Sequence, residues 1–512
     1  MVASAVVGGC PTNRDDDDDN GGTTTSSSSG GPLPDAGRGE LGDAGTGGRI
    51  PGCLDDDGID LFAVEGDTVL ALSWNNHTGQ PATGGYRIIF GAPPSIDPDE
   101  VVVPCTTDVC EHTLTGLQND VTYTAGVQAL GADAGALAES CSVSATPHVL
   151  RFAPEIRPAD EGSDAQANPS ISGGRIGVPL LLAWAEGGAV RWSMSTDLGD
   201  SWTAAAVLEG AEAGAAPSVA MLDRSDEVRP SFVFVALQSG GNIRVVRGRG
   251  NPDGGPTPTW DPPVDLGPGT LPSVAVRDDV VVVAFENANG IHVARSEDDG
   301  ESFGQVQRVD TGSDSHAPSV ALDANGTDVY VGFHGKRGRG DDDIYLVHSA
   351  DGAETFGAEV RVDDDAGGNN QRHVSLAVDA RTDTVLATWE DRRNGADVYF
   401  ANSLDLGESF EASVNVGVGL NGDQTSPRSV ADPGRNVYVL FIDSSNGQRA
   451  VFSRFNAEGG FDPPLTTSSQ AGTGGAAARE PAVFVDAYGT IYATWSENRG
   501  SPTPRLFFAR AD

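Results

Sequence analysis

The stretch Ser296–Phe303, which reads Ser-Glu-Asp-Asp-Gly-Glu-Ser-Phe, decides the fold of most of this 512-residue chain. It places a serine, an aspartate and a glycine at alternate positions and ends on an aromatic residue. In such a turn the carboxylate can accept backbone N–H groups across a hairpin, and glycine supplies a positive φ. The pattern therefore predicts a tight turn between two strands, closed by an aromatic side chain.

The same turn recurs along the chain. Complete copies are Ser195, Asp197, Gly199 and Trp202; Ser296, Asp298, Gly300 and Phe303; and Ser403, Asp405, Gly407 and Phe410. A fourth copy is degenerate and consists of Ser349, Asp351 and Phe356, with Ala353 where glycine belongs. Because recurrence at a fixed period marks repeat architectures, these aspartates are expected to be structural and not catalytic.

A second phrase, proline-serine followed by apolar residues, opens each group of expected strands. It occurs at 169–171, 217–220, 272–276 and 318–322, and in weaker form at 374–378, 429–431 and 481–485. The spacing of about 45–57 residues is that of one four-stranded unit. Seven phrases predict seven units, with six as the alternative. The last unit lacks a fourth strand, and Phe152–Arg157, which is similar to 303–308 and 356–361, is predicted to complete it.

These turns and strands resemble the Asp boxes, or BNR repeats, of sialidase-like β-propellers. The resemblance covers residues 148–512 and implies an all-β propeller of seven blades, or of six. It also implies that the Asp boxes lie on one face. Binding chemistry is then expected on the opposite face, where loops join second to third strands and each blade to the next.

Residues 55–147 alternate apolar and polar residues in short runs separated by turn formers, which predicts further strands. Val69–Trp74 and Gly85–Phe90 read as strands, and Tyr123 follows Leu117 by six residues. That spacing resembles the tyrosine corner of fibronectin type III domains and implies a β-sandwich. In that fold Cys53 is expected to pair with Cys141, and Cys105 with Cys110.

The cysteines and the start of the chain indicate export. Val7–Cys10 resembles a bacterial lipobox, so residues 1–10 are interpreted as a truncated lipoprotein signal with Cys10 as the lipidation site; a chance match is the alternative. Residues 11–54 are rich in Asp, Gly, Ser and Thr and predict a disordered tether. The other four cysteines lie in one short region, as in a disulfide-bonded exported module. We expect an extracellular, outer-membrane lipoprotein.

Charge and composition exclude several classes of partner. A net charge of −42 argues against nucleic-acid binding, which needs a basic face. No apolar run is long enough to span a bilayer, so the membrane is reached only through the lipid anchor. The acidity is interpreted as a solvated surface, with a cationic or calcium partner as the alternative. No cofactor is expected, although structural calcium is possible, and the protein is expected to be a monomer.

The expected binding face contains all candidate site residues. Catalytic candidates are the carboxylates Glu390, Asp391 and Glu497, and ligand-binding candidates are Arg372, His373, Arg392, Arg428, Arg479 and Arg499. Sialidases need three arginines and a tyrosine nucleophile; Arg372, Arg428 and Arg479 could mimic the former, but the tyrosines fall within strands or on the wrong face. We therefore expect binding of a glycan or protein ligand without catalysis. A sialidase-like exo-glycosidase or another glycoside hydrolase, and a structural envelope scaffold, are the alternatives.

Overall fold

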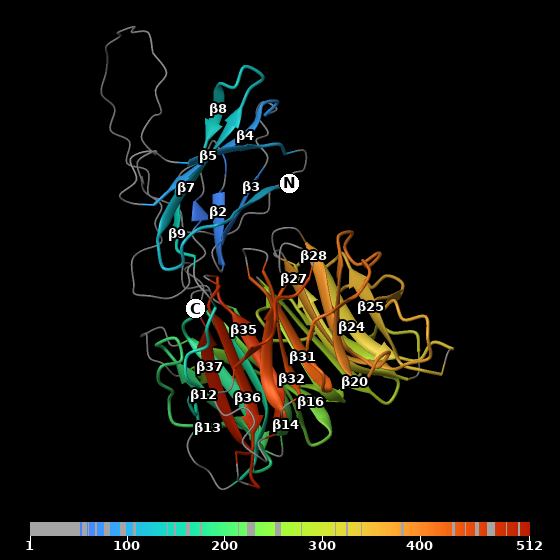
Figure 1. Ribbon diagram of the computed structural model, residues 1–512. Helices are drawn as coiled ribbons and strands as arrows, with labels where there is room; N and C mark the ends of the chain where they lie inside the picture. Colours follow the sequence, from blue (N-terminus) through green and yellow to red (C-terminus); the bar gives the residue numbers. More distant parts are fainter. Residues whose placement is uncertain are drawn as a thin grey trace, which may run out of the picture. The chain divides into compact units, whose positions relative to one another are not determined.

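The structure is a computed structural model, and its elements are all β-strands (Figure 1). It describes residues 52–53, 59, 61–66, 69–75, 82–92, 99–105, 109–140, 142–147, 150–159, 164–174, 177–212, 214–222, 231–250, 258–277, 279–312, 314–323, 326–338, 340–379, 383–432, 436–445, 447–455, 460–467, 477–487, 489–499 and 502–511. Within these residues no helix is long and apolar enough to cross a membrane. The chain forms two compact units, Ala5–Arg151 and Phe152–Asp512, which are described separately.

The first unit contains two antiparallel sheets. One has the order β1 (Gly52–Cys53), β2 (Leu61–Gly66), β3 (Val69–Asn75) and β6 (Val109–Leu114). The other has the order β5 (Asp99–Val103), β4 (Gly85–Gly91), β7 (Tyr123–Leu130) and β8 (Ala136–Glu139), with β9 (Val143–Ala145) also on β7.

The core of this unit is built around an aromatic pair. Trp74 and Tyr86 are fully buried and meet edge to face, with ring centroids 5.5 Å apart. The Tyr123 hydroxyl accepts the backbone N–H of Gln118 at 3.1 Å, which fixes the corner before β7. A disulfide joins Cys105 to Cys110, the pair expected from the sequence. The expected Cys53–Cys141 pair and the lipidation site Cys10 lie outside the residues whose side chains are described.

The second unit contains seven antiparallel sheets in its described residues, numbered here in chain order. The first three are β10 (Gln166–Gly173), β11 (Leu180–Glu186), β12 (Ala189–Ser195) and β13 (Ala206–Glu212); β14 (Gly214–Leu222), β15 (Phe232–Ser239), β16 (Asn242–Arg249), β17 (Thr259–Trp260) and β18 (Val264–Pro268); and β19 (Thr270–Arg277), β20 (Val280–Asn287), β21 (Gly290–Ser296) and β22 (Gln307–Arg308).

The fourth to seventh sheets continue the same order. They are β23 (Ser315–Leu322), β24 (Val329–Gly335), β25 (Asp343–Ser349) and β26 (Val360–Arg361); β27 (Gln371–Asp379), β28 (Thr384–Asp391), β29 (Asp397–Ser403) and β30 (Val414–Asn415); β31 (Gln424–Ala431), β32 (Val437–Asp443), β33 (Arg449–Arg454) and β34 (Leu465–Thr466); and β35 (Ala478–Val485), β36 (Ile491–Glu497) and β37 (Arg505–Ala511).

The first strands of the seven sheets lie next to one another in sequence order, and β35 lies beside β10. Serines of the proline-serine phrase connect them. Ser170 Oγ accepts the N–H of Val219 at 3.0 Å, and Ser218, Ser273, Ser319 and Ser375 make the same bond to the next first strand. A small hydroxyl at this position therefore links each inner strand to its neighbour.

The N-terminal segment of this unit completes the seventh sheet. Phe152 bridges Ala511 and Ile156 bridges Phe508, both antiparallel to β37, at the position expected from the sequence. Arg499 reinforces this contact, since its guanidinium pairs with Glu155 at 2.5 Å and lies 3.8 Å from the Phe507 ring centre. A hydrophobic cluster then joins the seventh sheet to the first through residues such as Ile171, Leu182, Tyr492 and Phe508.

The four recurring turns at 195–202, 296–303, 349–356 and 403–410, which we call the SxD turns, share one hydrogen-bond pattern. Ser195 Oγ donates to Asp197 Oδ1 (2.7 Å) and accepts the N–H of Gly199 (2.8 Å). Asp197 also accepts the N–H and hydroxyl of Ser201. The other three turns repeat these bonds.

The fourth copy is complete in geometry although its sequence is degenerate. Ala353 takes the glycine conformation with φ 69° and donates its N–H to Ser349 Oγ at 2.9 Å. Its methyl packs into the core cluster that contains Val293 and Val331. Hydrogen bonds from Thr355 and Ser349 lower the pKa of Asp351 to about 2, as expected for a carboxylate that holds a turn.

Candidate ligand-binding site

The face opposite the SxD turns is formed by the starts of first strands and the ends of second strands. Each first strand begins with a bulge, where its pairing with the second strand shifts register. One residue of each bulge has a positive φ between 48° and 56°: Asn168, Ala216, Leu271, Ala317, His373, Ser426 and Glu480. These residues are not glycine, so each bulge holds a conformation that costs about 1 kcal/mol or more. The described chain thus presents seven equivalent bulges at one end of its sheets.

Three histidines meet at this end of the fourth and fifth sheets. His316 is the second residue of β23, His334 is the last but one of β24, and His373 lies at the bulge of β27. The His334 ring centre is 5.6 Å from that of His316 and 5.8 Å from that of His373. The chain has eight histidines, so this convergence concentrates a scarce residue type at one place.

Carboxylates and cations surround these rings. We call the three histidines and the following residues together the histidine cluster: Glu286, Asp314, Lys336, Asp342, Arg372, Glu390 and Arg392. Arg372 pairs with buried Asp342 at 2.5 Å, and Arg392 pairs with buried Glu390 at 2.7 Å. The cluster draws on the third, fourth and fifth sheets, and no single stretch of sequence supplies it.

The three histidines differ in electrostatic environment. His316 has both ring nitrogens 2.9 Å from carboxylate oxygens, of Glu286 and Asp314, an arrangement that only the imidazolium satisfies fully. Although burial opposes it, these bonds raise the pKa of His316. Burial and the neighbouring His373 lower the pKa of His334 to about 3, so this ring is neutral. Its Nδ1 is buried and has no hydrogen-bond partner among the described residues.

Glu390 is the candidate carboxylate that belongs to the cluster. Its side chain is buried and accepts from Arg392 at 2.7 Å, with His373 Nδ1 at 3.3 Å. Burial would raise the pKa of Glu390, but these two bonds hold it below its ordinary value. An ionised, doubly hydrogen-bonded carboxylate can orient a hydroxyl or a cation, and it is a poor proton donor near neutral pH.

Asp391 and Glu497, the other two candidate carboxylates, are held by bonds within their own sheets. Asp391 is fully buried and accepts from the Trp389 indole at 3.0 Å and from Arg393 at 2.8 Å. Glu497 accepts in the same way from Trp495 and Arg499, both at 3.0 Å. These two carboxylates therefore stabilise the ends of β28 and β36.

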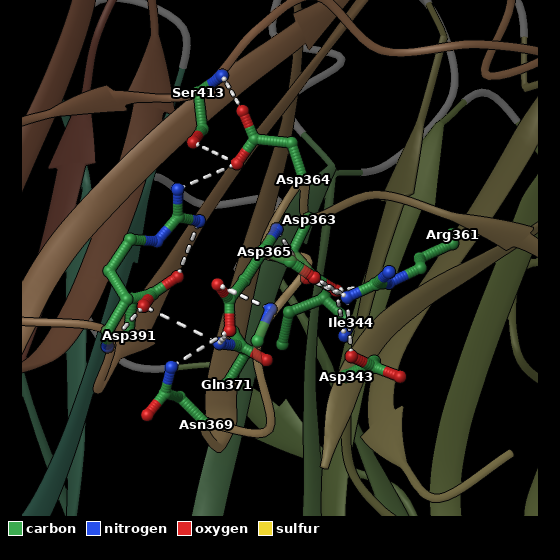
Figure 2. A network of polar contacts seen from close by, with 12 residues as sticks. Asp343, Ile344, Arg361, Asp363, Asp364, Asp365, Asn369, Gln371, Asp391 and Ser413 are labelled. Atoms are coloured by element: carbon green, nitrogen blue, oxygen red, sulfur yellow. Dashed lines mark hydrogen bonds and ion pairs between the residues drawn. The ribbon is translucent and has the colours of Figure 1, made fainter. Parts of the chain in front are cut away.

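The polar network around Asp391 extends into the connection between the fourth and fifth sheets (Figure 2). Asp364 accepts from Arg393 at 2.8 Å and from the hydroxyl of Ser413 at 2.6 Å. On the other side, Arg361 donates to both Asp343 and Asp363 at 2.6 Å. Burial raises the pKa of Asp363 despite this pairing. Every carboxylate named here is matched by an arginine or hydroxyl donor, so the network fastens the two sheets together.

The arginine candidates fall into three environments. Arg372 and Arg392 belong to the histidine cluster, and Arg499 fastens the closing segment to the seventh sheet. Arg428 and Arg479 lie on β31 and β35 and form no ion pair within the described part of the chain. Both are exposed to solvent.

Six residues of the histidine cluster were not among the candidate site residues of the sequence analysis: Glu286, Asp314, His316, His334, Lys336 and Asp342. The pairing register of the first and second strands could have revealed them. His316 and Arg372 both stand two residues before the proline-serine position of their phrases, and they pair across the sheet with His334 and Glu390. Among the described residues, no group of three or more His, Cys, Asp or Glu is placed to hold a metal ion.

No protein-family model matches the sequence, and no curated protein matches it. Solved structures similar to it include the α-L-arabinanase of Penicillium chrysogenum, 13% identical, covering 71% of this chain and 98% of that one, with a TM-score of 0.44. An ulvan lyase is 12% identical over 70% of this chain and 95% of its own, with a TM-score of 0.49. A variant of the NanB sialidase of Streptococcus pneumoniae is 10% identical over 88% of this chain and 83% of its own, with a TM-score of 0.38. Likenesses at this level carry no inference about chemistry.

Proposed function

We propose that this chain is an exported surface protein whose second unit, a seven-bladed β-propeller, binds a glycan or protein ligand at the histidine cluster without catalysis. The seven sheets, their seven bulges and the contact of β35 with β10 support the blade count. The shared bonds of the SxD turns support their interpretation as Asp boxes. The Gln118–Tyr123 bond supports a fibronectin type III fold for the first unit.

The observation that carries the binding proposal is the meeting of the His316, His334 and His373 rings beside two ion pairs with buried carboxylates, His373 with Glu390 and Arg372 with Asp342. Pre-oriented acceptors and donors at the end of adjacent rigid strands suit recognition of hydroxyl-rich ligands, because each polar group is held in place before the ligand arrives. Of the two ligand classes, glycan and protein, a glycan fits best, because its hydroxyl groups can replace solvent water as hydrogen-bond partners of these side chains.

The state of the candidate acids favours binding over hydrolysis. A glycosidase of the usual kind needs one carboxylic acid with a raised pKa beside a second carboxylate. Here the pKa of Glu390 is lowered, while Asp391 and Glu497 are engaged with tryptophan and arginine. A sialidase-type nucleophile also lacks support, because the described strand tyrosines Tyr330, Tyr345, Tyr399, Tyr438 and Tyr492 are buried.

Export and surface attachment complete the proposal. A disulfide between Cys105 and Cys110 supports folding in an oxidising compartment. The expected tether of residues 11–54 is too long at its end, because Gly52–Cys53 form strand β1 and pair with β2. Lipidation of Cys10 would place both units at the cell surface on a tether that ends before Gly52. Metabolic labelling with a fatty-acid analogue tests this part, since a Cys10→Ala chain should carry no label.

The binding proposal is tested with a glycan array and a pair of matched variants. His373→Asn removes an exposed ring of the cluster, and asparagine tolerates the left-handed conformation at that bulge. Ala216→Asn places the same residue at the equivalent bulge of the second sheet, where Asn168 in the first sheet shows that it fits. We expect the first variant to lose about tenfold in affinity, near 1.4 kcal/mol, and the second to bind as the unchanged chain does.

Turnover of chromogenic glycosides is measured on the same proteins. Release of sugar that is lost in Glu390→Gln would replace the binding proposal with the glycoside hydrolase alternative. Equal binding by His373→Asn and the unchanged protein would remove the cluster as the site. An array without any bound glycan, together with no retained protein ligand, would favour the scaffold alternative.

A further inference from the structure

One register position near the bulge differs in charge from sheet to sheet. It is held by the residue just before the left-handed residue of each bulge, at the last pair before the register shifts. In chain order its residues are Ala167, Ala215, Thr270, His316, Arg372, Thr425 and Arg479. Within the histidine cluster, Arg372 places a permanent charge at this position, whereas the charge of His316 depends on a proton. The fourth and fifth sheets thus differ in whether a change of pH can remove their cation.

Both residues reach back to a carboxylate of the preceding sheet. Arg372 pairs at 2.5 Å with buried Asp342, which directly precedes β25 of the fourth sheet. His316 places its Nδ1 2.9 Å from Glu286 of β20 in the third sheet, and its Nε2 lies 2.9 Å from Asp314. A cation at this position therefore joins neighbouring sheets at the ligand site. The joint is fixed in the fifth sheet, and in the fourth it lasts only while His316 keeps its proton.

A neutral His316 cannot keep both of its bonds. Neutral imidazole has one N–H donor, and its other nitrogen presents a lone pair. That lone pair would face a carboxylate oxygen at 2.9 Å and repel it. Each carboxylate has a second partner that remains, since Glu286 accepts the N–H of Ala317 at 3.2 Å and Asp314 pairs with Lys336 at 3.1 Å. Loss of the proton therefore frees the imidazole from one carboxylate and leaves that carboxylate less firmly placed.

Charged and titratable groups from several elements surround His316. They are Glu286 of β20, Asp314 before β23, His334 of β24, Lys336 after β24, and His373 and Arg372 of β27. Burial opposes the charge of His316, but the two carboxylate bonds raise its pKa above the ordinary histidine pKa of 6.5. Burial and His373 hold the pKa of the adjacent His334 at about 3, so the proton of this pair of rings belongs to His316.

We propose that the proton of His316 controls the affinity of the histidine cluster for its ligand. The cluster holds the ligand while His316 is protonated and releases it as an alkaline pH removes the proton. The inference rests on the proposed function, since it concerns the same site. Glu286 and Asp314 reach solvent, with 19% and 43% of their side chains exposed, so a ligand can contact both. With the proton present they are fixed before the ligand arrives. After its loss one of them must be ordered on binding, and the affinity falls.

Two substitutions separate the proton from the ring. His316→Arg makes the cation permanent, as Arg372 does at the same register position of the next sheet. The His316 side chain is 41% exposed, which leaves room for the longer guanidinium group. His316→Gln removes the charge at every pH. The matched control is His292→Gln, because His292 lies in β21, outside the cluster, with its Nδ1 3.2 Å from the carbonyl of Gly290.

Calorimetry on the full chain uses neutral tetrasaccharides of glucose, galactose and arabinose at pH 6.5 and pH 9. A neutral ligand does not titrate in this range, so the pH acts on the protein alone. We expect the unchanged protein and His292→Gln to bind at least one tetrasaccharide about tenfold more tightly at pH 6.5 than at pH 9. His316→Arg should bind tightly at both pH values, and His316→Gln weakly at both. A pH dependence that survives in His316→Arg, or its absence from the unchanged protein, overturns the proposal.

Failure of the wider function is distinguishable from failure of the proton control. If a tetrasaccharide binds equally at both pH values and His373→Asn weakens it, the glycan site stands and the role of His316 falls. If none binds, urea melts at pH 6.5 and pH 9 test the proton on the protein alone. Because the pKa of His316 is raised on folding, its stabilisation is complete below pH 6.5 and is lost as the pH rises through the folded pKa. A fall in the urea midpoint that is smaller in His316→Arg supports the proton-held joint without the glycan, and an equal fall removes it.

Discussion

The first and second sheets begin with the same backbone conformation as the fourth and fifth sheets. The side chains at these starts differ, because they are mostly small or uncharged in the first pair of sheets and ionisable in the second pair. Each contains the bulge with one left-handed residue and the same register shift. At the pair before the bulge, the first sheet places Ala167 opposite Ala185, whereas the fourth places His316 opposite His334. The fifth places Arg372 opposite Glu390. One scaffold thus carries a plain sector and a charged sector.

The difference teaches that in this chain repetition specifies the fold and departure from repetition specifies the site. Residues that recur, such as the serines and glycines of the two phrases, make the same bond in sheet after sheet. Other residues, such as His373 and Arg428, interrupt the pattern. Each stands at a backbone position that recurs in every sheet, but its side chain is not repeated in the other sheets. The comparison predicts that changes to repeated residues act on stability, and changes to the departures act on binding.

The largest effect is expected at Gly199 in the first SxD turn. Its φ is 90°, and a Cβ there would lie 2.3 Å from the Phe508 ring, so Gly199→Ala adds strain and a clash inside the seam between the first and seventh sheets. We expect a loss of about 3 kcal/mol in the free energy of unfolding, from urea denaturation. Gly188→Ala is the matched control, because its φ is 78° and no atom lies within 4 Å of its added Cβ. A loss for Gly199→Ala no larger than for Gly188→Ala would show that the seam is loosely packed.

The fold was largely predictable because its determinants are local and repeated. The expected strands Val69–Trp74 and Gly85–Phe90 lie within β3 and β4, and Phe152–Arg157 pairs with β37 as expected. Each of these patterns needs only neighbouring residues or a copy elsewhere in the chain.

The site was only partly predictable, since it depends on which side of a strand a residue faces and what lies opposite. Glu390 and Asp391 are adjacent and identical in charge, yet one meets His373 and the other the Trp389 indole. Arg499 reads as a ligand-binding residue until Glu155 is brought beside it from 344 residues away. His316 and His334 lie in sequence among apolar strand residues, and only their cross-strand pairing shows that they belong together.

The charged sector is tested by the pH dependence of stability at His334. Burial first, and His373 next, hold its pKa at about 3 in the folded protein, against the ordinary histidine pKa of 6.5. Because the unfolded chain binds a proton below pH 6.5 and the folded one does not until about pH 3, this residue destabilises the fold progressively as the pH falls through that window.

Replacing the ring by His334→Phe removes that proton. Between pH 7 and pH 5 the unchanged protein should lose about 2 kcal/mol more stability than the variant, from urea melts at the two pH values. His316 affects the pH dependence of stability with the opposite sign, because its pKa is raised in the folded protein. This contribution is the same in both proteins and cancels in the comparison so long as the bonds of His316 to Glu286 and Asp314 persist. The other groups around His334, namely Lys336, Asp342, Arg372 and His373, are common to both chains. An identical loss in the two proteins would mean that His334 is protonated in the fold.

The smallest effect, and the sharpest test of the comparison, comes from removing one serine hydroxyl in each sector. Ser170 Oγ accepts from Val219 between the first and second sheets, and Ser319 Oγ accepts from Leu376 between the fourth and fifth, both at about 3.0 Å. Loss of one such bond should cost about 1 kcal/mol. If the inner ring is a uniform scaffold, Ser170→Ala and Ser319→Ala lower the free energy of unfolding equally and leave ligand affinity unchanged. A Ser319→Ala variant that weakens binding while Ser170→Ala does not would show that the hydroxyl ring positions the charged sector, and the separation of scaffold from site would fail there.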